Sequence, residues 1–129
     1  MLYDIYKEII IYKKVKMGFE KFVLSGKSFR PKVSIRKSGM FGFNNALINK
    51  FNIKSYKFVI LFFDKEKKII GFKFSNNNEE EGIYKLSIRE KSVSFSGKAF
   101  LDFYDIKVTN TKRFEANWDN KNEMLVIKI

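Results

Sequence analysis

Two short segments of this 129-residue sequence carry lysine, serine and arginine at alternate positions. They read KVSIR at residues 32–36 and KLSIR at residues 85–89. Because successive side chains of a strand point to opposite faces of a sheet, each segment would bury its apolar residues and turn its polar ones to solvent. Rows of cationic side chains bind phosphate groups. The two segments therefore predict a phosphate-binding sheet surface.

Eight basic residues are candidates for this surface. They lie in the two segments, before the first segment and directly after it: Lys21, Lys27, Arg30, Lys32, Arg36, Lys37, Lys85 and Arg89. Aromatic residues make up 17% of the chain, with 15 phenylalanines, so we expect some exposed rings beside these cations to stack on unpaired bases. The alternative is an ordinary wet sheet face that lysines keep soluble.

The composition argues against catalysis. The chain contains no cysteine and no histidine, which removes thiolates, disulfides, zinc–thiolate sites and imidazole bases. Asp102 and Asp105 fall on an expected helix without a second group for acid–base chemistry. We expect a protein that is not an enzyme and that uses neither a cofactor nor a metal. An enzyme that relies on carboxylates, lysine, tyrosine or serine remains an alternative to the nucleic-acid-binding and protein-binding functions considered below.

Two segments match ligand-binding motifs only in part. SGKS at residues 25–28 has the end of a phosphate-binding P-loop, but Lys21 stands where the first glycine is needed. DNKNE at residues 119–123 lacks the glycine and the distal glutamate of a calcium-binding EF-hand loop. We interpret it as a polar hairpin turn.

The net charge of +12 is unevenly distributed. Residues 1–57 hold 13 basic and three acidic residues, whereas residues 58–129 hold 13 basic and 11 acidic residues. The first half is therefore expected to attract polyanions. The 22 lysines against four arginines favour phosphate contacts over base reading, because arginine makes most bidentate guanine contacts. An AT-rich coding sequence is the alternative explanation of the lysine excess.

The N-terminus lacks the features of a secretion signal. Asp4 and Glu8 stand where such a signal is basic, and the apolar run at residues 9–11 is short. No segment approaches the length of a membrane span. We expect a soluble cytoplasmic protein without a membrane partner, associated with the nucleoid if it binds DNA.

The repeated pentapeptide extends into a longer internal match. Residues 32–54 align with residues 85–107 without a gap, and the match resumes after a two-residue insertion. The aligned residues include Phe51 with Tyr104 and Phe63 with Trp118. We interpret the chain as a single domain with an internal duplication. Its parts are an N-terminal segment (1–31), repeat 1 (32–74), a linker (75–83) and repeat 2 (84–129).

Each repeat has the pattern strand, strand, helix, strand, strand. Repeat 1 predicts a helix capped by Asn44, a central strand at 56–64 that is apolar on both faces, a turn at 64–68 and a strand at 69–74. Repeat 2 predicts a helix capped by Ser96. Before Pro31, residues 6–15 fit a strand or a helix, and residues 19–25 fit a strand. The expected class is a β-dominated α+β fold, with antiparallel sheets or a barrel and two short helices.

Two family resemblances bear on function. SVSFSGKAFLDF at residues 92–103 resembles the strand-to-helix junction of the single-strand-binding transcriptional coactivators related to the plant Whirly proteins. Those proteins hold melted DNA against sheets built from paired ββββα units. Residues 33–74, VSIRKSGMFGFNNALINKFNIKSYKFVILFFDKEKKIIGFKF, are similar to the AbrB-type swapped-hairpin unit, and two copies resemble the MraZ arrangement. Asn44 replaces a common proline of that family, and its run of helix arginines is missing.

We therefore expect a non-enzymatic protein that binds nucleic acid, DNA more than RNA, and single strands more than duplexes. One alternative is an AbrB-like regulator that binds duplex DNA. Another is a protein-interaction module or small inhibitor from a mobile element, acting on an acidic protein. Self-association into a homodimer or a larger homo-oligomer is left open.

Overall fold

The computed structural model describes Phe19 and residues 30–129. The strand or helix expected at residues 6–15, the rest of the strand expected at 19–25, and the candidates Lys21 and Lys27 lie outside the described residues. Within that part of the chain, neither α-helix has the length and apolarity needed to cross a membrane.

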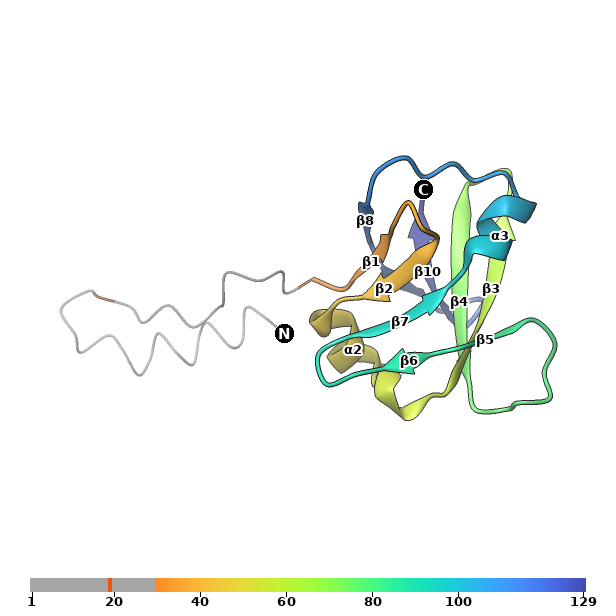
Figure 1. Cartoon of the computed structure of the whole chain (residues 1–129). Helices are drawn as coiled ribbons and strands as arrows, with labels where there is room; N and C mark the ends of the chain where they lie inside the picture. Colours follow the sequence, from red (N-terminus) through yellow and green to blue (C-terminus); the bar gives the residue numbers. More distant parts are fainter. Residues whose placement is uncertain (1–18, 20–29) are drawn as a thin grey trace.

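The described strands form two five-stranded antiparallel sheets (Figure 1). The first sheet has the order β6-β7-β2-β1-β8, with β1 (Lys32–Ile35), β2 (Met40–Phe43), β6 (Ser87–Ile88), β7 (Val93–Ser96) and β8 (Lys112–Glu115). The second sheet has the order β5-β3-β4-β10-β9, with β3 (Phe58–Asp64), β4 (Ile69–Ser75), β5 (Ile83–Lys85), β9 (Asn117–Asp119) and β10 (Met124–Lys128). The predicted β-dominated α+β class is confirmed.

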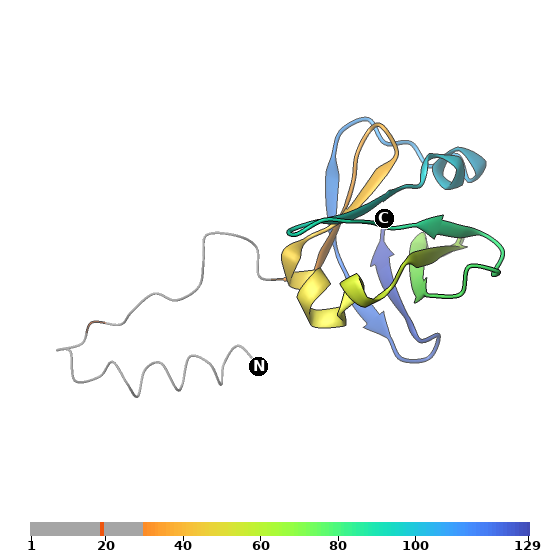
Figure 2. The same cartoon turned by 60° about the horizontal axis from the view of Figure 1, so that its bottom comes forward.

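The two sheets pack face to face around a core of phenylalanine rings. Phe41 of β2 stacks on Phe95 of β7 with their ring centroids 4.9 Å apart, and both rings meet Phe72 of β4 in the other sheet. Phe41 and Phe72 are fully buried. Figure 2 shows the two layers from the side. Much of the aromatic content therefore fills the interior, where each ring buries a large apolar area.

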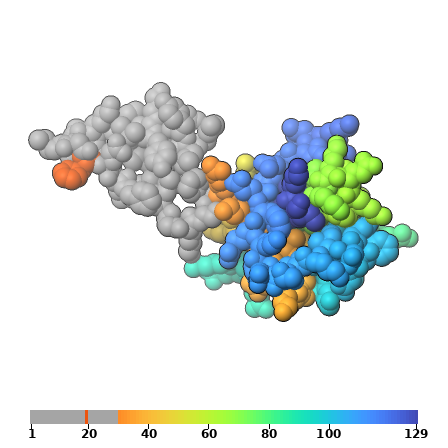
Figure 3. Space-filling view, turned by 90° about the horizontal axis from the view of Figure 1, so that it is seen from above, coloured from red at the N-terminus to blue at the C-terminus, as the bar shows by residue number. Residues whose placement is uncertain are grey.

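Short helices close opposite ends of the sandwich. α2 (Asn45–Phe51) is followed by the 3₁₀-helix η1 (Ile53–Ser55), and α3 (Lys98–Phe103) lies at the other end (Figures 1 and 2). Seen from above, α3 and the segment after it, in blue, cover that end beside the orange β1–β2 hairpin (Figure 3).

The helix starts test two predicted caps. Asn44 caps α2 as expected, since its side-chain oxygen accepts a hydrogen bond from the Leu47 backbone N–H. The prediction that Ser96 caps the second helix is wrong, because Ser96 still pairs with Met40 in the sheet. Gly97 is the cap residue. A Cβ at Gly97 would lie 2.5 Å from the Phe41 ring, so the core leaves no room there for a side chain.

The chain changes sheets at two buried corner residues. Between β5 and β6 it turns at Leu86, whose N–H donates to the Lys57 carbonyl at 2.9 Å, and between β8 and β9 it turns at Ala116, whose N–H donates to the Pro31 carbonyl at 3.0 Å. At each bend, the residues before it pair in one sheet and the residues after it pair in the other. The described strands form two separate sheets. Of the two expected arrangements, antiparallel sheets are therefore confirmed and the barrel is wrong.

The strands and α-helix of the first half follow the predicted ββαββ order, with β1, β2, α2, β3 and β4. In the second half, the bends at Leu86 and Ala116 leave three strands before α3 and three after it, where two and two were expected. Four of the residues that align between the two predicted repeats contact each other across the repeats. Phe51 stacks on Trp118 with centroids 6.0 Å apart, and Tyr104 contacts Phe63 at 5.0 Å. The C-terminal end of each helix thus packs on a strand of the other predicted repeat. The duplication itself stays a prediction.

Candidate nucleic-acid interface

A row of small side chains crosses the outward face of the first sheet. The strand registers place Ser87 opposite Ser94, Ser94 opposite Gly42, Gly42 opposite Ser34, and Ser34 opposite Arg113. Directly paired residues of antiparallel strands share a face. The row therefore runs across all five strands on the side away from the core, and it ends at an arginine.

At the middle of this row, two neighbouring residues leave no large side chain above the sheet. The Ser34 hydroxyl lies 3.4 Å from the Gly42 carbonyl and donates a hydrogen bond to it. A Cβ at Gly42 would lie 3.0 Å from the same hydroxyl. A larger residue at position 42 would push into the space above the sheet. The glycine therefore keeps the face hollow at its centre.

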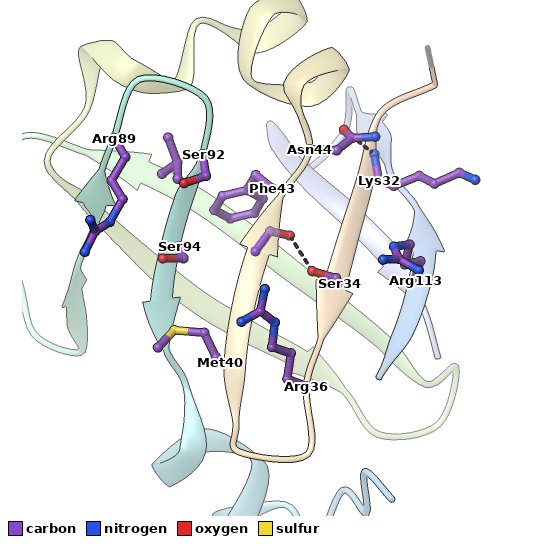
Figure 4. A pocket seen from close by; sticks show the side chains of 12 residues that line it. Lys32, Ser34, Arg36, Met40, Phe43, Asn44, Arg89, Ser92, Ser94 and Arg113 are labelled. Atoms are coloured by element: carbon purple, nitrogen blue, oxygen red, sulfur yellow. Dashed lines mark hydrogen bonds between the residues drawn. The ribbon is translucent and has the colours of Figure 1, made fainter. Parts of the chain in front are cut away.

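Basic side chains surround this floor. They border a hollow of about 430 Å³, which we call the basic hollow (Figure 4). Arg36 follows β1 and projects toward the middle of the hollow (Figure 4). Arg89 lies beyond β7, and Arg113 lies on the opposite side of the hollow with Lys32. The full lining is Lys32, Ser34, Arg36, Met40, Gly42, Phe43, Asn44, Arg89, Ser92, Val93, Ser94 and Arg113.

The charge of the basic hollow is not neutralised from within. None of its lining residues is acidic, and the ion pairs found among the described residues involve none of its four cations. The nearest carboxylate in the β1–β8 ladder is Glu115, opposite Lys32, and it pairs with Arg30 at 3.0 Å. With neighbouring strands about 4.8 Å apart, the row from β6 to β8 spans about 19 Å. The hollow is thus an elongated, positively charged trough.

Asn44 fixes the backbone at one end of the basic hollow. Its side-chain oxygen accepts hydrogen bonds from the backbone N–H groups of Leu47 and Lys32, both at 3.0 Å. Its amide nitrogen donates to the Arg30 carbonyl at 2.8 Å. One side chain therefore ties the start of α2 to the entry into β1. This network sets where Lys32 emerges from the sheet.

Three of the predicted site residues come together, namely Lys32, Arg36 and Arg89. Arg30 lies at the margin beside Glu115, and Lys37 is exposed in the β1–β2 turn and does not line the hollow.

Lys85 departs from its predicted place. It lies on β5 of the second sheet, opposite Phe58, whereas Ser87 lies on the first sheet. The expectation that Lys85, Ser87 and Arg89 form one row is wrong, because the corner at Leu86 divides them.

Arg113 lines the basic hollow but is not among the residues predicted from the sequence. It lies about 80 positions from its neighbour Ser34 along the chain, and alternation within a strand does not reveal which strand lies beside it. The available signal was the scarcity of arginine. The four arginines of the chain are Arg30, Arg36, Arg89 and Arg113; three of them line the basic hollow, and the fourth borders its sheet. The first half of the chain supplies two lining cations and the second half the other two, so the basic face does not belong to the first half alone.

The exposed aromatic rings lie elsewhere. Phe43 borders the basic hollow but is 3% exposed. Among the described residues of the two sheets and helices, the exposed rings are Phe62 on β3, Phe103 on α3 and Trp118 on β9. Our expectation that rings and cations share one sheet face does not hold for the described residues.

The carboxyl groups whose pKa values are lowered also lie outside the basic hollow. The hydrogen-bonded Lys107 side chain lowers the pKa of Asp105, and hydrogen bonds from Asn122 lower the pKa of Asp119. Asp119 accepts these bonds in the turn between β9 and β10, as the hairpin interpretation of residues 119–123 predicts. Within the described part of the chain, no three acidic side chains gather where they would hold a metal ion.

Comparisons with known proteins identify no relative. No protein-family model matches the sequence, and neither the curated proteins nor the solved structures contain a match. The resemblances to the Whirly-type and AbrB-type proteins stay predictions.

Proposed function

We propose that this protein is a non-enzymatic nucleic-acid-binding protein that holds the phosphate backbone in the basic hollow. One observation carries the proposal. Three of the four arginines in a chain with 22 lysines line a single hollow whose floor is serine and glycine.

The side-chain chemistry suits phosphate. Arginine presents a planar fork of N–H donors that matches phosphate oxygens, and serine hydroxyls also donate to them. Small floor residues such as Gly42 and Ser94 let a backbone approach the sheet closely. At the 3.4 Å stacked spacing of nucleotides, a 19 Å row accommodates roughly five or six nucleotides.

The placement of the arginines argues against the alternative that an AT-rich coding sequence alone explains the basic composition. An AT-rich coding sequence would raise the number of lysines over the whole chain without gathering the few arginines on one face. Nothing in that bias accounts for Arg36, Arg89 and Arg113 reaching one hollow from three separate segments. The arrangement supports a ligand with repeated negative charge.

A binding comparison at constant net charge tests the proposal. The test variant is Arg36→Ala/Arg89→Ala/Arg113→Ala, and the matched control is Lys67→Ala/Lys85→Ala/Lys128→Ala, whose lysines are exposed on turns and on the second sheet. Fluorescence anisotropy with labelled single-stranded and duplex oligonucleotides of about 12 nucleotides measures affinity. Losing three phosphate contacts at about 0.1 M salt should weaken binding about a hundredfold, whereas the control should change it less than about threefold.

Two results would contradict the proposal. Equal weakening by the two triple variants would show that only total charge matters. Absence of binding to any oligonucleotide by the wild type would favour the protein-interaction alternative, in which the arginines recognise an acidic protein.

A further inference from the structure

A second concave site lies at the other end of α2. It is a cleft of about 490 Å³, which we call the aromatic cleft, and Phe51, Tyr56, Phe74, Trp118, Lys73 and Glu123 line it. Tyr56 contacts Phe74 with ring centroids 5.8 Å apart. Fully buried Phe72 and Leu125 form its base. Concave sites with mostly apolar walls and a few polar groups are where proteins bind flat organic groups.

Trp118 is the most accessible of these rings. It stands on the edge strand β9 opposite Leu125, so it points to the core side of the sheet but beyond the covered core. One side of the indole stacks on Phe51, at 6.0 Å between centroids and 24° between planes. The indole nevertheless remains 46% exposed. A stacked ring pair with a free surface is a ready platform for a third flat ring.

The cleft suits a ring with polar edges. Glu123 supplies hydrogen-bond acceptors at its lining. Lys50 lies 5.7 Å from the Phe51 ring centroid, which adds positive charge beside the stack. A nucleobase has a flat apolar face and hydrogen-bonding edges, and it is attached to a negatively charged backbone. Its chemistry therefore complements both the rings and Lys50.

The aromatic cleft and the basic hollow are connected by α2. Asn44, which caps the helix, lines the basic hollow, and Phe51, the last residue of the helix, lines the aromatic cleft. Seven residues of α-helix span about 10 Å, which is within reach of two or three nucleotides at the 3.4 Å stacked spacing. We propose that the aromatic cleft stacks an unpaired nucleobase of the same strand whose phosphates lie in the basic hollow. This inference rests on the proposed function and specifies a single strand, because a paired base is not free to stack.

Trp118 reports directly on this site because it is the only tryptophan in the chain. The test titrates the wild-type protein with two strands of about 12 units, one of thymidine nucleotides and one of abasic deoxyribose phosphates with the same charge. Anisotropy of a label on the strand measures binding, and intrinsic fluorescence measures contact with Trp118. We expect both strands to bind and only the thymidine strand to quench Trp118.

Variants sharpen the comparison. Trp118→Ala should weaken binding of the thymidine strand about tenfold and leave the abasic strand unchanged. Phe103→Ala removes a ring that is 80% exposed on α3, away from the cleft, and should change neither. Should Trp118→Ala fail to fold, the wild-type quenching measurement still decides the matter.

The possible failures are distinguishable. Binding of the thymidine strand without quenching, or equal quenching by the abasic strand, overturns the base-stacking inference alone. If neither strand binds, the proposed function fails and the inference fails with it.

Discussion

Replacing Asn44 by alanine should cost a substantial part of the stability, because its side chain makes three hydrogen bonds to backbone groups, two at the entry into β1 and one at the start of α2. The lost helix cap at Leu47 costs about 1 kcal/mol. The N–H of Lys32 and the carbonyl of Arg30 lose their partners at about 0.5–1.5 kcal/mol each. The sum is about 2–4 kcal/mol, which for a chain of this size lowers the melting temperature by about 6–16 °C.

Urea denaturation monitored by far-UV circular dichroism measures this loss. Asn44→Asp keeps the two accepted hydrogen bonds and loses only the donation to Arg30, so it should cost about 1 kcal/mol. Asn45→Ala, at the next and exposed position, should change the free energy of unfolding by less than about 0.5 kcal/mol. A loss for Asn44→Ala no larger than that of Asn45→Ala would refute the role of Asn44 as the link between α2 and β1.

Three further measurements test the packing, the β9–β10 turn and the basic hollow. Gly97→Ala should lower the free energy of unfolding by about 1–3 kcal/mol, because its Cβ would meet the buried Phe41 ring, whereas Ser96→Ala should have almost no effect in the same urea titration. Hydrogen bonds from Asn122 lower the pKa of Asp119 below its ordinary 3.8, so the stability they provide is complete above about pH 5 and is lost as the pH falls through the lowered pKa. The difference in urea midpoint between wild type and Asp119→Ala should therefore narrow from about pH 5 to about pH 2, and a constant difference would contradict this. With four cations lining the basic hollow, the logarithm of the binding constant should fall with the logarithm of salt concentration at a slope of about −2.8 on a single strand, and Arg113→Ala should make the slope shallower by about 0.7. An unchanged slope in Arg113→Ala would remove that residue from the site.

Local patterns predicted those parts of the fold that depend on local chemistry. Asn44 is a good cap wherever its helix packs, and Asp64 begins the turn at 64–68 because its carboxylate accepts from the next backbone N–H groups, those of Glu66 and Lys67. The strand expected at 56–64 appears as β3, which pairs on both edges with β4 and β5. Its double-sided apolar pattern correctly indicated an interior position in the sheet.

The parts that the sequence did not predict depend on contacts between distant segments. A strand that bends at Leu86 has the same alternating pattern as a straight one, so the pattern placed Lys85 and Arg89 on one face. The position of Gly97 as helix cap follows from the Phe41 ring, which belongs to a different hairpin. Arg113 joins the basic hollow only because β8 pairs with β1. Tertiary packing decided each of these cases.

The most direct test of the central claim is to observe the arginine side chains while nucleic acid binds. The chain has four arginines, so a ¹⁵N-labelled sample gives four side-chain Nε–Hε signals, which single Arg→Lys variants assign. On titration with a strand of about 12 nucleotides, we predict that the signals of Arg36, Arg89 and Arg113 shift together with the backbone amides of Ser34, Gly42 and Ser94. If the strand binds while these signals stay in place, or if the largest changes occur around Lys85 on the second sheet, the basic hollow is not the binding surface.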